Sequence, residues 1–477
     1  MNREKKDHMK TKAEVTAFLA LTFLLLVSFV GGIMESASIQ SAKSYRRADM
    51  NRAMESSFAE YQKELLEEYD IFALDASYES GVYSEEHFLD RLDYYGAGGM
   101  EQEIERIQLL TDNGCEAFEE QVARYIETKY GLNLPEHLSF HPEEWREKET
   151  AYEETYDQAE QEKESITGVI DTMLAESATE LPSENNPLPN ISSLSAKPLV
   201  ELVMQEGQMV SKKSVSLSEA SSHRNLNKGH GDFRDVAEKK EVSKIGLGQY
   251  MISHFSCAAG RNGESLSGEY GDRGERVLEY ELEYILCGKK SDRENLDAVL
   301  KKLLMFRFVP NYAFLQKDQA SRTQAEALAL ALTTAAAVPA ASEAVTQVIL
   351  LAWAFGESVM DLRSLINGNR VPVTKNAGSW QLSLGGLMKL GTDEDVQDGM
   401  DSESGLSYEE YIRGLLLLED KTAMCKRCLD LVEWNLQTEK GLSWFRVDQC
   451  ISKMEVRSTV SLRRGITYRF RTYYGYR

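Results

Sequence analysis

The sequence predicts a mainly α-helical (α+β) fold in which an N-terminal transmembrane helix continues into a long amphipathic helix. This prediction rests on an uncharged run near the N-terminus, helical spacing of apolar residues over most of the chain, and alternating residues near the C-terminus. Apolar residues every three or four positions are typical of helices, and alternation is typical of strands. We therefore expect a helical extracytoplasmic domain that ends in a small β-hairpin.

The composition of the chain limits its function. The chain has 477 residues, and its 42% hydrophobic content allows buried cores to form. Its formal net charge of −23 argues against nucleic-acid binding, because contacts to phosphates need clustered Lys and Arg. The six cysteines are too few and too scattered for a disulfide framework, so they leave the redox compartment open.

The uncharged run lies between Glu14 and Glu35, with Val15 as its first residue and Met34 as its last. A helix of about twenty residues spans roughly 30 Å, the thickness of the hydrocarbon core of a bilayer. The core helix of a soluble protein normally has a polar stripe, and this run has none. We predict that the run contacts the lipid bilayer along its whole length and that the two glutamates mark its borders.

The residues on either side of the run bear on whether it is cleaved. The basic residues within 1–12 suit a signal peptide or a retained anchor equally, but the run is longer than a usual signal core. Residues 35–69 contain no Pro or Gly and continue a helical pattern. We therefore expect one unbroken helix from about residue 13 to 69, retained in the membrane. Since a short tail usually stays inside, we expect a cytoplasmic N-terminus.

The rest of the chain reads mostly as helices. We expect helices over 100–131 and 141–174, with the many glutamates of the second on a solvated face. Two Ala-rich helices are expected over 319–366, broken at Pro339. The second is apolar, but Glu343 and Glu357 leave too short a stretch to span a bilayer, so a buried core helix is favoured. Further helices are expected as follows: from 275, from 291 with a Ser291–Glu294 capping box, over 406–419 and over 420–438.

Prolines and serines from residue 182 onward mark a linker or insertion. Near the C-terminus, alternating residues around Arg464 and Gly465 predict the hairpin. Its arginines either bind a partner's acidic surface or neutralise the chain's own helices.

The predicted organisation is a basic cytoplasmic tail (1–12), a transmembrane helix (13–34), an amphipathic stalk helix (35–75), an acidic helical region (76–181), a flexible linker or insertion (182–245) and a helical domain ending in the hairpin (246–477).

The sequence contains no convincing catalytic or metal-binding motif. Cys425 and Cys428 have the spacing of a redox or zinc half-site, but they lie in a helical stretch without a second such pair. This thiol pair is therefore assigned to helix packing, with a disulfide or metal role as the alternative. The acidic stretch 393–405 resembles a calcium loop, yet Val396 occupies a position that needs an oxygen ligand. We expect no catalytic, cofactor-binding or metal site.

Several segments together resemble a known family. They are "VTAFLALTFLLLVSFVGGIMESASIQSA", "SSFAEYQKELLEEYDIFALD", "LEYILCGKKSDRENL", "AEALALAL", "LLAWAFGESVMDLRSLINGNRVPV" and "WQLSLGGLM". In this order they resemble bacterial membrane proteins with a domain of unknown function, which are similar to the TadE/TadG-like minor pseudopilins of Tad-type pilus assembly loci. One departure is that Glu14 stands at the border of the apolar run, whereas the prepilin pattern places this acid inside it.

The resemblance implies a non-catalytic, single-pass protein of the bacterial cell membrane, without a cofactor. It would be an accessory or minor pseudopilin-like subunit of a Tad-type pilus or secretion apparatus, with other proteins of that apparatus as partners. Two alternatives remain: a membrane-tethered surface module for binding or sensing, and a cell-surface or cell-wall hydrolase.

Overall fold

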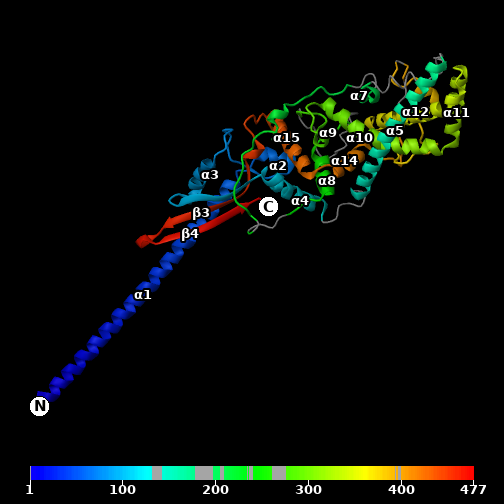
Figure 1. The fold of residues 1–477 in the computed structure, drawn as a ribbon. Coiled ribbons are helices and arrows are strands. Elements are labelled where there is room, and N and C mark those ends of the chain that lie inside the picture. The colour runs from blue at the N-terminus through cyan, green and yellow to red at the C-terminus, as the bar shows by residue number, and fades with distance from the viewer. Residues whose placement is uncertain are drawn as a thin grey trace.

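The computed structural model describes residues 2–131, 142–177, 197–204, 209–233, 235, 240–259, 276–392, 394–395 and 399–476. As predicted, the fold is mainly helical, with a long N-terminal apolar helix and a small C-terminal antiparallel sheet (Figure 1). The elements are α1 (Asn2–Phe58), α2 (Lys63–Tyr69), β1 (Leu74–Asp75), α3 (Glu85–Leu92), the π-helical turn η1 (Asp93–Ala97), β2 (Glu101–Leu109), α4 (Asp112–Tyr130), α5 (Pro142–Ser177), α7 (Leu199–Val203), η3 (Leu217–Glu219), α8 (Lys244–His254), α9 (Glu281–Cys287), α10 (Asp292–Lys317), α11 (Gln319–Ala335), η4 (Pro339–Ala341), α12 (Ser342–Ile366), α13 (Leu384–Leu387), α14 (Tyr408–Leu418), α15 (Lys421–Glu439), η5 (Val447–Gln449), β3 (Cys450–Ser461), η6 (Arg463–Gly465) and β4 (Thr467–Gly475).

The first helix is shorter at its C-terminal end than the sequence indicated. The prediction of one unbroken helix to residue 69 is wrong, because α1 ends at Phe58 and the chain turns before α2 begins. Phe58 is buried against the sheet, whereas Leu65 and Tyr69 are buried in a separate helical core. A straight helix would carry Leu65 about 10 Å further along the α1 axis, so it could not fill both cores.

The sheet has four strands, and β3 lies at its centre. β2 pairs with one edge of β3, and β1 and β4 pair with the other, all antiparallel. The prediction of a single helix over 100–131 is therefore wrong in its first part, which forms β2. A register shift between Ile104 and Arg106 lets Ile104 and Ile107, three residues apart in the sequence, face the same side of the strand, and that apolar spacing imitates a helix.

The described residues form two main hydrophobic cores that follow one another along the molecule, besides a small cluster around Val338. The smaller core joins the end of α1, α3 and the sheet, and the larger core joins α2 and α4 to the helices that follow (Figure 1). The predicted helices over 319–366 are confirmed as α11 and α12, with the break at Ala337, which has a positive φ, and Pro339. The hydroxyl of Ser291 caps α10 by accepting from the Glu294 N–H at 3.3 Å.

The apolar helix α12 is a core helix, as predicted. In its most apolar window 89% of the residues are buried, and it lies between α5, α10 and α11 at the end of the molecule far from the start of α1 (Figure 1). Its length and composition alone would also suit a membrane span. Burial by neighbouring helices leaves no lipid-facing surface for such a role.

The predicted linker over 182–245 is only partly described, since 178–196, 205–208, 234 and 236–239 lie outside the described residues. Its described stretch 209–233 is fastened to the helical core and to the sheet. The hydroxyl of Ser222 donates to Asp430 at 2.6 Å, and the N–H of His230 donates to the carbonyl of Ile107 at 2.9 Å. This stretch therefore connects the two cores by specific contacts.

Candidate membrane anchor and its junction with the head

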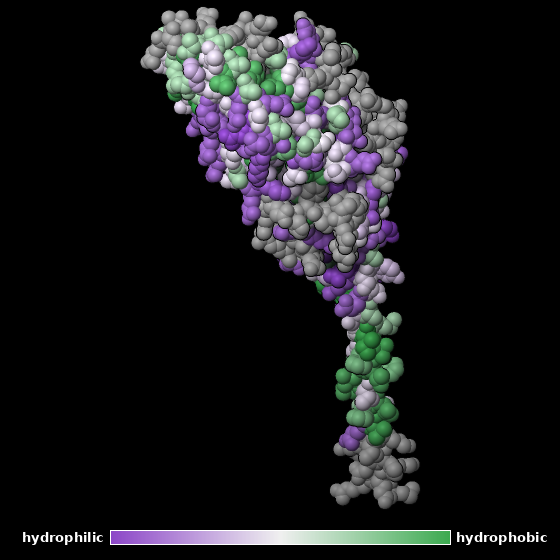
Figure 2. Space-filling model, turned by 90° about the vertical axis from the view of Figure 1, so that its right-hand side faces the viewer, coloured by the Kyte–Doolittle hydropathy of each residue, from purple (hydrophilic) through white to green (hydrophobic). Residues whose placement is uncertain are grey.

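Residues 15–34 of α1, here called the anchor segment, project from the rest of the protein as an isolated apolar rod. None of the most apolar window of this helix is buried, and Phe23 and Leu24 are each 70% exposed (Figure 2). Soluble monomers rarely leave an apolar surface of this extent in water. The segment therefore has the length, composition and exposure of a helix that contacts lipid or neighbouring apolar helices.

The hydroxyl of Thr22 in the anchor segment is satisfied within the helix. The hydroxyl of Thr22 bonds to the carbonyls of Phe18 and Leu19 at 2.9 and 3.0 Å. Such internal bonds matter in hydrocarbon, where no water is present to satisfy a hydroxyl. The Thr22 side chain, near the middle of the segment, is thus compatible with an apolar surrounding.

The two predicted border acids have different environments. Glu14 is exposed on α1. Glu35 forms an ion pair with Arg464 at 2.6 Å, and Arg464 lies in η6, the turn between β3 and β4. The turn of the hairpin therefore lies beside the C-terminal border of the anchor segment (Figure 1).

Beyond Glu35, β4 runs along α1 in the same direction, away from the turn of the hairpin. Lys43 lies over the ring of Tyr468 at 5.1 Å, and Arg47 lies over the ring of Phe470 at 5.6 Å. Two residues of a strand advance about 6.7 Å and four residues of a helix about 6 Å, so every second residue of β4 lies level with every fourth residue of α1. Alternate β4 side chains thus form a continuous seam along α1.

The end of α1 is held in the smaller core. Met50, Ala53, Met54 and Phe58, spaced three or four residues apart, are fully buried or nearly so. The ring of Phe58 packs against the rings of Phe88, Tyr474 and Tyr476 at centroid distances of 5.6, 4.5 and 5.2 Å. The described residues from 50 onward are here called the head. The helix that bears the anchor segment is therefore packed firmly into the head at its C-terminal end.

The hairpin arginines mainly contact acids of this chain. Arg471 pairs with Glu105 at 2.5 Å, and Arg457 pairs with Glu103 and Glu105 of β2. Of the two alternatives that the sequence left open for these arginines, neutralisation of the chain's own acids accounts for these pairs. The acids lie on a strand, β2, rather than on the helices that the sequence suggested.

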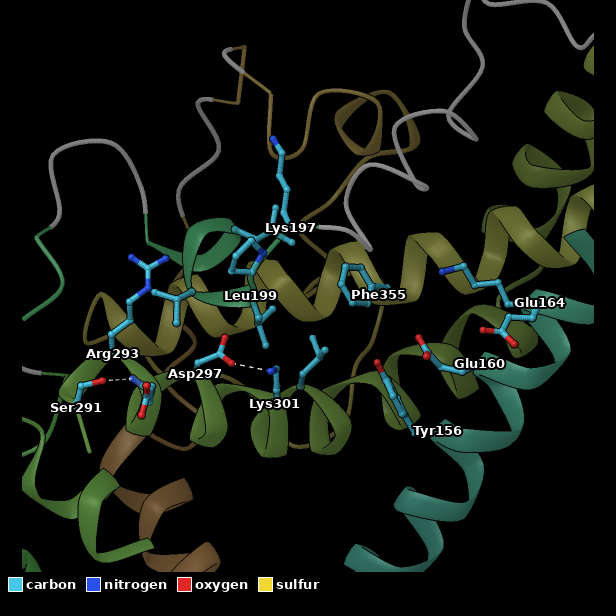
Figure 3. Close-up of a pocket in the computed structure, with 16 residues that line it drawn as sticks. Tyr156, Glu160, Glu164, Lys197, Leu199, Ser291, Arg293, Asp297, Lys301 and Phe355 are labelled. Carbon is cyan, nitrogen blue, oxygen red and sulfur yellow. Dashed lines mark hydrogen bonds and ion pairs between the residues drawn. The ribbon is translucent and has the colours of Figure 1, made fainter. Parts of the chain in front are cut away.

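The head also has a surface pocket of about 1000 Å³ between α5, α7, α10 and α12 (Figure 3). Leu199, Leu304 and Phe355 supply apolar lining, and charged side chains surround it. Three of these charges have partners, since Lys301 pairs with Asp297 at 2.7 Å and Arg293 with Glu201 at 2.6 Å. The lining mixes both signs of charge, so the pocket has no evident preference for a charged ligand.

A cluster of buried charged side chains lies within the helical core, and its members bind one another. Asp361 on α12 accepts from Arg307 at 3.0 Å and from Lys375 at 2.7 Å, and all three side chains are at most 1% exposed. Glu357, one turn earlier, pairs with Lys375 at 2.6 Å. This cluster holds α10, α12 and the chain after α12 together, and its burial keeps it from any substrate.

Another buried acid, Glu283 on α9, has no cationic partner within hydrogen-bond distance among the described residues. One carboxyl oxygen accepts from the Ala258 N–H at 2.8 Å and the Tyr408 hydroxyl at 2.7 Å, and the other has no partner among the described residues. Burial raises the pKa of Glu283 to about 7. A carboxyl group in this setting is neutral over much of the acidic range.

Cys425 and Cys428 lie on α15 with both thiols buried and free. Burial raises the pKa of both thiols well above the ordinary value, which makes them poor nucleophiles and poor metal ligands. Among the described residues no group of three or more His, Cys, Asp or Glu side chains is placed to hold a metal ion. Part of the acidic stretch 393–405, including Val396, lies outside those residues.

The sequence predicts the exposed apolar run over 15–34, and its assignment of Glu14 and Glu35 as membrane borders stays a prediction, but it did not indicate the contact of the hairpin with α1. The available signal was the row of aromatic residues at alternate positions in β4, which marks a face that packs against another element.

A family model described as a family of unknown function (DUF5702) matches residues 177–462. Comparisons with curated proteins and with solved structures give no match.

Proposed function

The chain belongs to the DUF5702 family, whose function is unknown, and on that premise we propose that it is a membrane-anchored, non-catalytic subunit of a larger surface apparatus. The anchor segment crosses the membrane once, with the N-terminus in the cytoplasm and the head outside. Because the sequence resembles TadE/TadG-like pseudopilins, we propose that this apparatus is a Tad-type pilus or secretion apparatus of bacteria.

One observation carries this proposal. A single 57-residue helix is exposed and apolar over residues 15–34, and from Met50 onward it is packed into the head. Such a helix places an apolar surface in the membrane, where copies or pilin neighbours can pack along it, and holds the head at a fixed position. The seam between α1 and β4 supports this reading because it stiffens the helix where it leaves the membrane.

Membrane insertion is tested by charge substitutions in the middle of the anchor segment. Each arginine at a span centre costs about 3 kcal/mol, so the double variant Leu24→Arg/Leu25→Arg should move the protein into the soluble fraction or cause its degradation. The matched control is Ser44→Arg/Tyr45→Arg on an exposed part of the same helix, which should stay in the membrane fraction. Equal fractionation of the two variants would contradict insertion.

The apparatus is tested by crosslinking in the intact cell. A photoreactive amino acid at Leu26, which is 61% exposed, should capture a pilin or secretion subunit encoded beside this chain. The same group at exposed Glu343 on α12, at the far end of the head, should give no such product. Crosslinks only to copies of this chain or to lipid would argue against a role in the apparatus.

The alternative of a tethered binding or sensory module would rest on the pocket between α5, α7, α10 and α12. Phe355→Ala alters this pocket without touching the anchor segment. Under our proposal the variant keeps its crosslinks and its role in assembly. Loss of function with the crosslinks intact would favour the binding module.

A further inference from the structure

The turn between β3 and β4, here called the hairpin tip (461–467), lies at the level where the anchor segment ends. Arg464 pairs with Glu35, which directly follows the last apolar residue, Met34. If residues 15–34 fill the hydrocarbon core, Glu35 lies among the lipid headgroups, and the tip lies at the same depth. The height of the tip above the membrane is thus fixed by its contact with α1.

The side chains at this level are predominantly basic. Arg463 is exposed, and the Arg464 side chain is 76% exposed although it contacts Glu35. Lys43 and Arg47 lie over rings of β4 about two and three helical turns beyond Glu35, roughly 12 and 18 Å further along α1, so they belong to the seam and not to this level. The positive charge of the tip occurs on a chain with a net charge of −23, and it faces the membrane surface.

Apolar side chains flank the two arginines of the tip. Ile466 is 36% exposed, and Leu462 is partly buried. Arginines next to partly exposed aliphatic side chains suit the boundary between headgroups and acyl chains, where the guanidinium binds phosphate and the apolar part contacts lipid. Arginine is also well suited to phosphate because its planar guanidinium makes paired hydrogen bonds.

We propose that the hairpin tip binds the phosphate groups of anionic phospholipids through Arg463 and Arg464. This inference rests on the proposed insertion of the anchor segment. It gives the protein a second membrane contact beside the transmembrane helix. The two contacts, joined by the seam along α1, would hold the head at one tilt to the membrane. A subunit that meets its neighbours in a fixed orientation needs such a fixed tilt.

The test uses the full chain in lipid nanodiscs and measures how fast phenylglyoxal modifies each arginine. One sample contains phosphatidylcholine alone, and a second contains phosphatidylcholine mixed with phosphatidylglycerol. A basic side chain at an anionic surface gains a factor of about five in binding, so Arg463 and Arg464 should react several-fold more slowly in the second sample. Both leaflets carry the same lipids, so the result does not depend on orientation.

Arg469 on the same hairpin is the internal control. It is exposed and lies five strand residues from Arg464, about 17 Å further from the membrane. This distance exceeds the screening length of about 8 Å at physiological salt, so its rate should be the same in both samples. Equal rates for the tip arginines in both lipids, or equal slowing of Arg469, would overturn the proposal.

A third sample separates lipid from free phosphate. Phosphatidylcholine nanodiscs with added inorganic phosphate should leave the tip arginines as reactive as without it, and equal protection would overturn the assignment to lipid. Hydrogen exchange over residues 15–34 in the same samples reports insertion separately. Slow exchange there with unprotected tip arginines would contradict this inference alone, whereas fast exchange there would contradict the proposed function.

Discussion

The hydroxyl of Tyr476 donates a hydrogen bond of 2.7 Å to the main-chain carbonyl of Phe58. Tyr476 directly follows β4, and Phe58 is the last residue of α1, so this bond joins the C-terminal strand to the end of the anchoring helix. Both residues are buried, and their rings are in contact. The helix that bears the anchor segment and the head are therefore connected through the last strand of the chain.

The bond between Tyr476 and Phe58 can be removed without losing the ring. Tyr476→Phe should lower the free energy of unfolding by about 1 kcal/mol, because a buried hydrogen bond is lost while the packing remains. Tyr45→Phe, at a position that is 72% exposed, is the matched control and should change little. All five tryptophans of the chain lie in the head, so urea unfolding followed by tryptophan fluorescence in detergent measures both variants. Equal unfolding midpoints would show that this bond contributes nothing.

The buried carboxyl of Glu283 should make stability depend on pH. Its folded pKa of about 7 lies above the ordinary 4.5, so the folded protein holds a proton that the unfolded chain releases between these values. The free energy of unfolding should therefore fall as pH rises from 4.5 through 7, by at most roughly 3 kcal/mol. Glu283→Gln should abolish this part of the pH dependence.

The control for Glu283 is an acid on the surface. The side chain of Glu343 is 72% exposed, so Glu343→Gln should keep the pH dependence of the parent chain. Unfolding midpoints in urea at pH 5.5 and pH 8 are sufficient for the comparison. Parallel changes in the Glu283→Gln variant and the parent would mean that another group causes the effect.

Asp361 should be among the most sensitive positions in the helical core. Asp361→Asn removes the charge that pairs with Arg307 and Lys375, and it leaves buried cations less compensated. Breaking a buried ion pair on one side costs about 3–5 kcal/mol, whereas the exposed pair of Arg322 and Glu326 contributes at most about 0.5 kcal/mol. Glu326→Gln is thus the control, and similar unfolding midpoints for both variants would refute this ranking.

The thiols of Cys425 and Cys428 should be inert in the folded protein. Both are buried, and their raised pKa values leave little thiolate at neutral pH. Maleimide should label them only after denaturation, while a cysteine introduced by Ser44→Cys on exposed α1 should react at once. Rapid labelling of Cys425 or Cys428 without denaturant, measured by mass spectrometry of peptides, would restore a redox or metal role for this pair.

Local signals were sufficient to predict part of this fold. The break at Pro339, the hairpin turn at Arg464 and Gly465, and the apolar run each depend on neighbouring residues. The sequence of β2 predicts a helix because a bulge lets Ile104 and Ile107, three residues apart, lie on one face of the strand. The end of α1 was missed because Phe58, Tyr61 and Leu65 continue helical spacing through a turn.

The contact between Glu35 and Arg464 joins residues that are 429 positions apart. No local pattern at either residue indicates the other, because their proximity depends on the shared rise of α1 and β4 and on the burial of Phe58. The anchor segment could therefore be predicted from sequence, whereas the position of the basic hairpin tip beside it required the three-dimensional arrangement.

The most direct test of the account is mass spectrometry of the protein that remains in membranes after extraction with alkaline carbonate. A retained anchor predicts an intact chain in this fraction, with peptides that cover residues 14–35. Recovery of the protein in the extract, or of a chain that begins near Ser38, would contradict a retained membrane anchor and with it the proposed role.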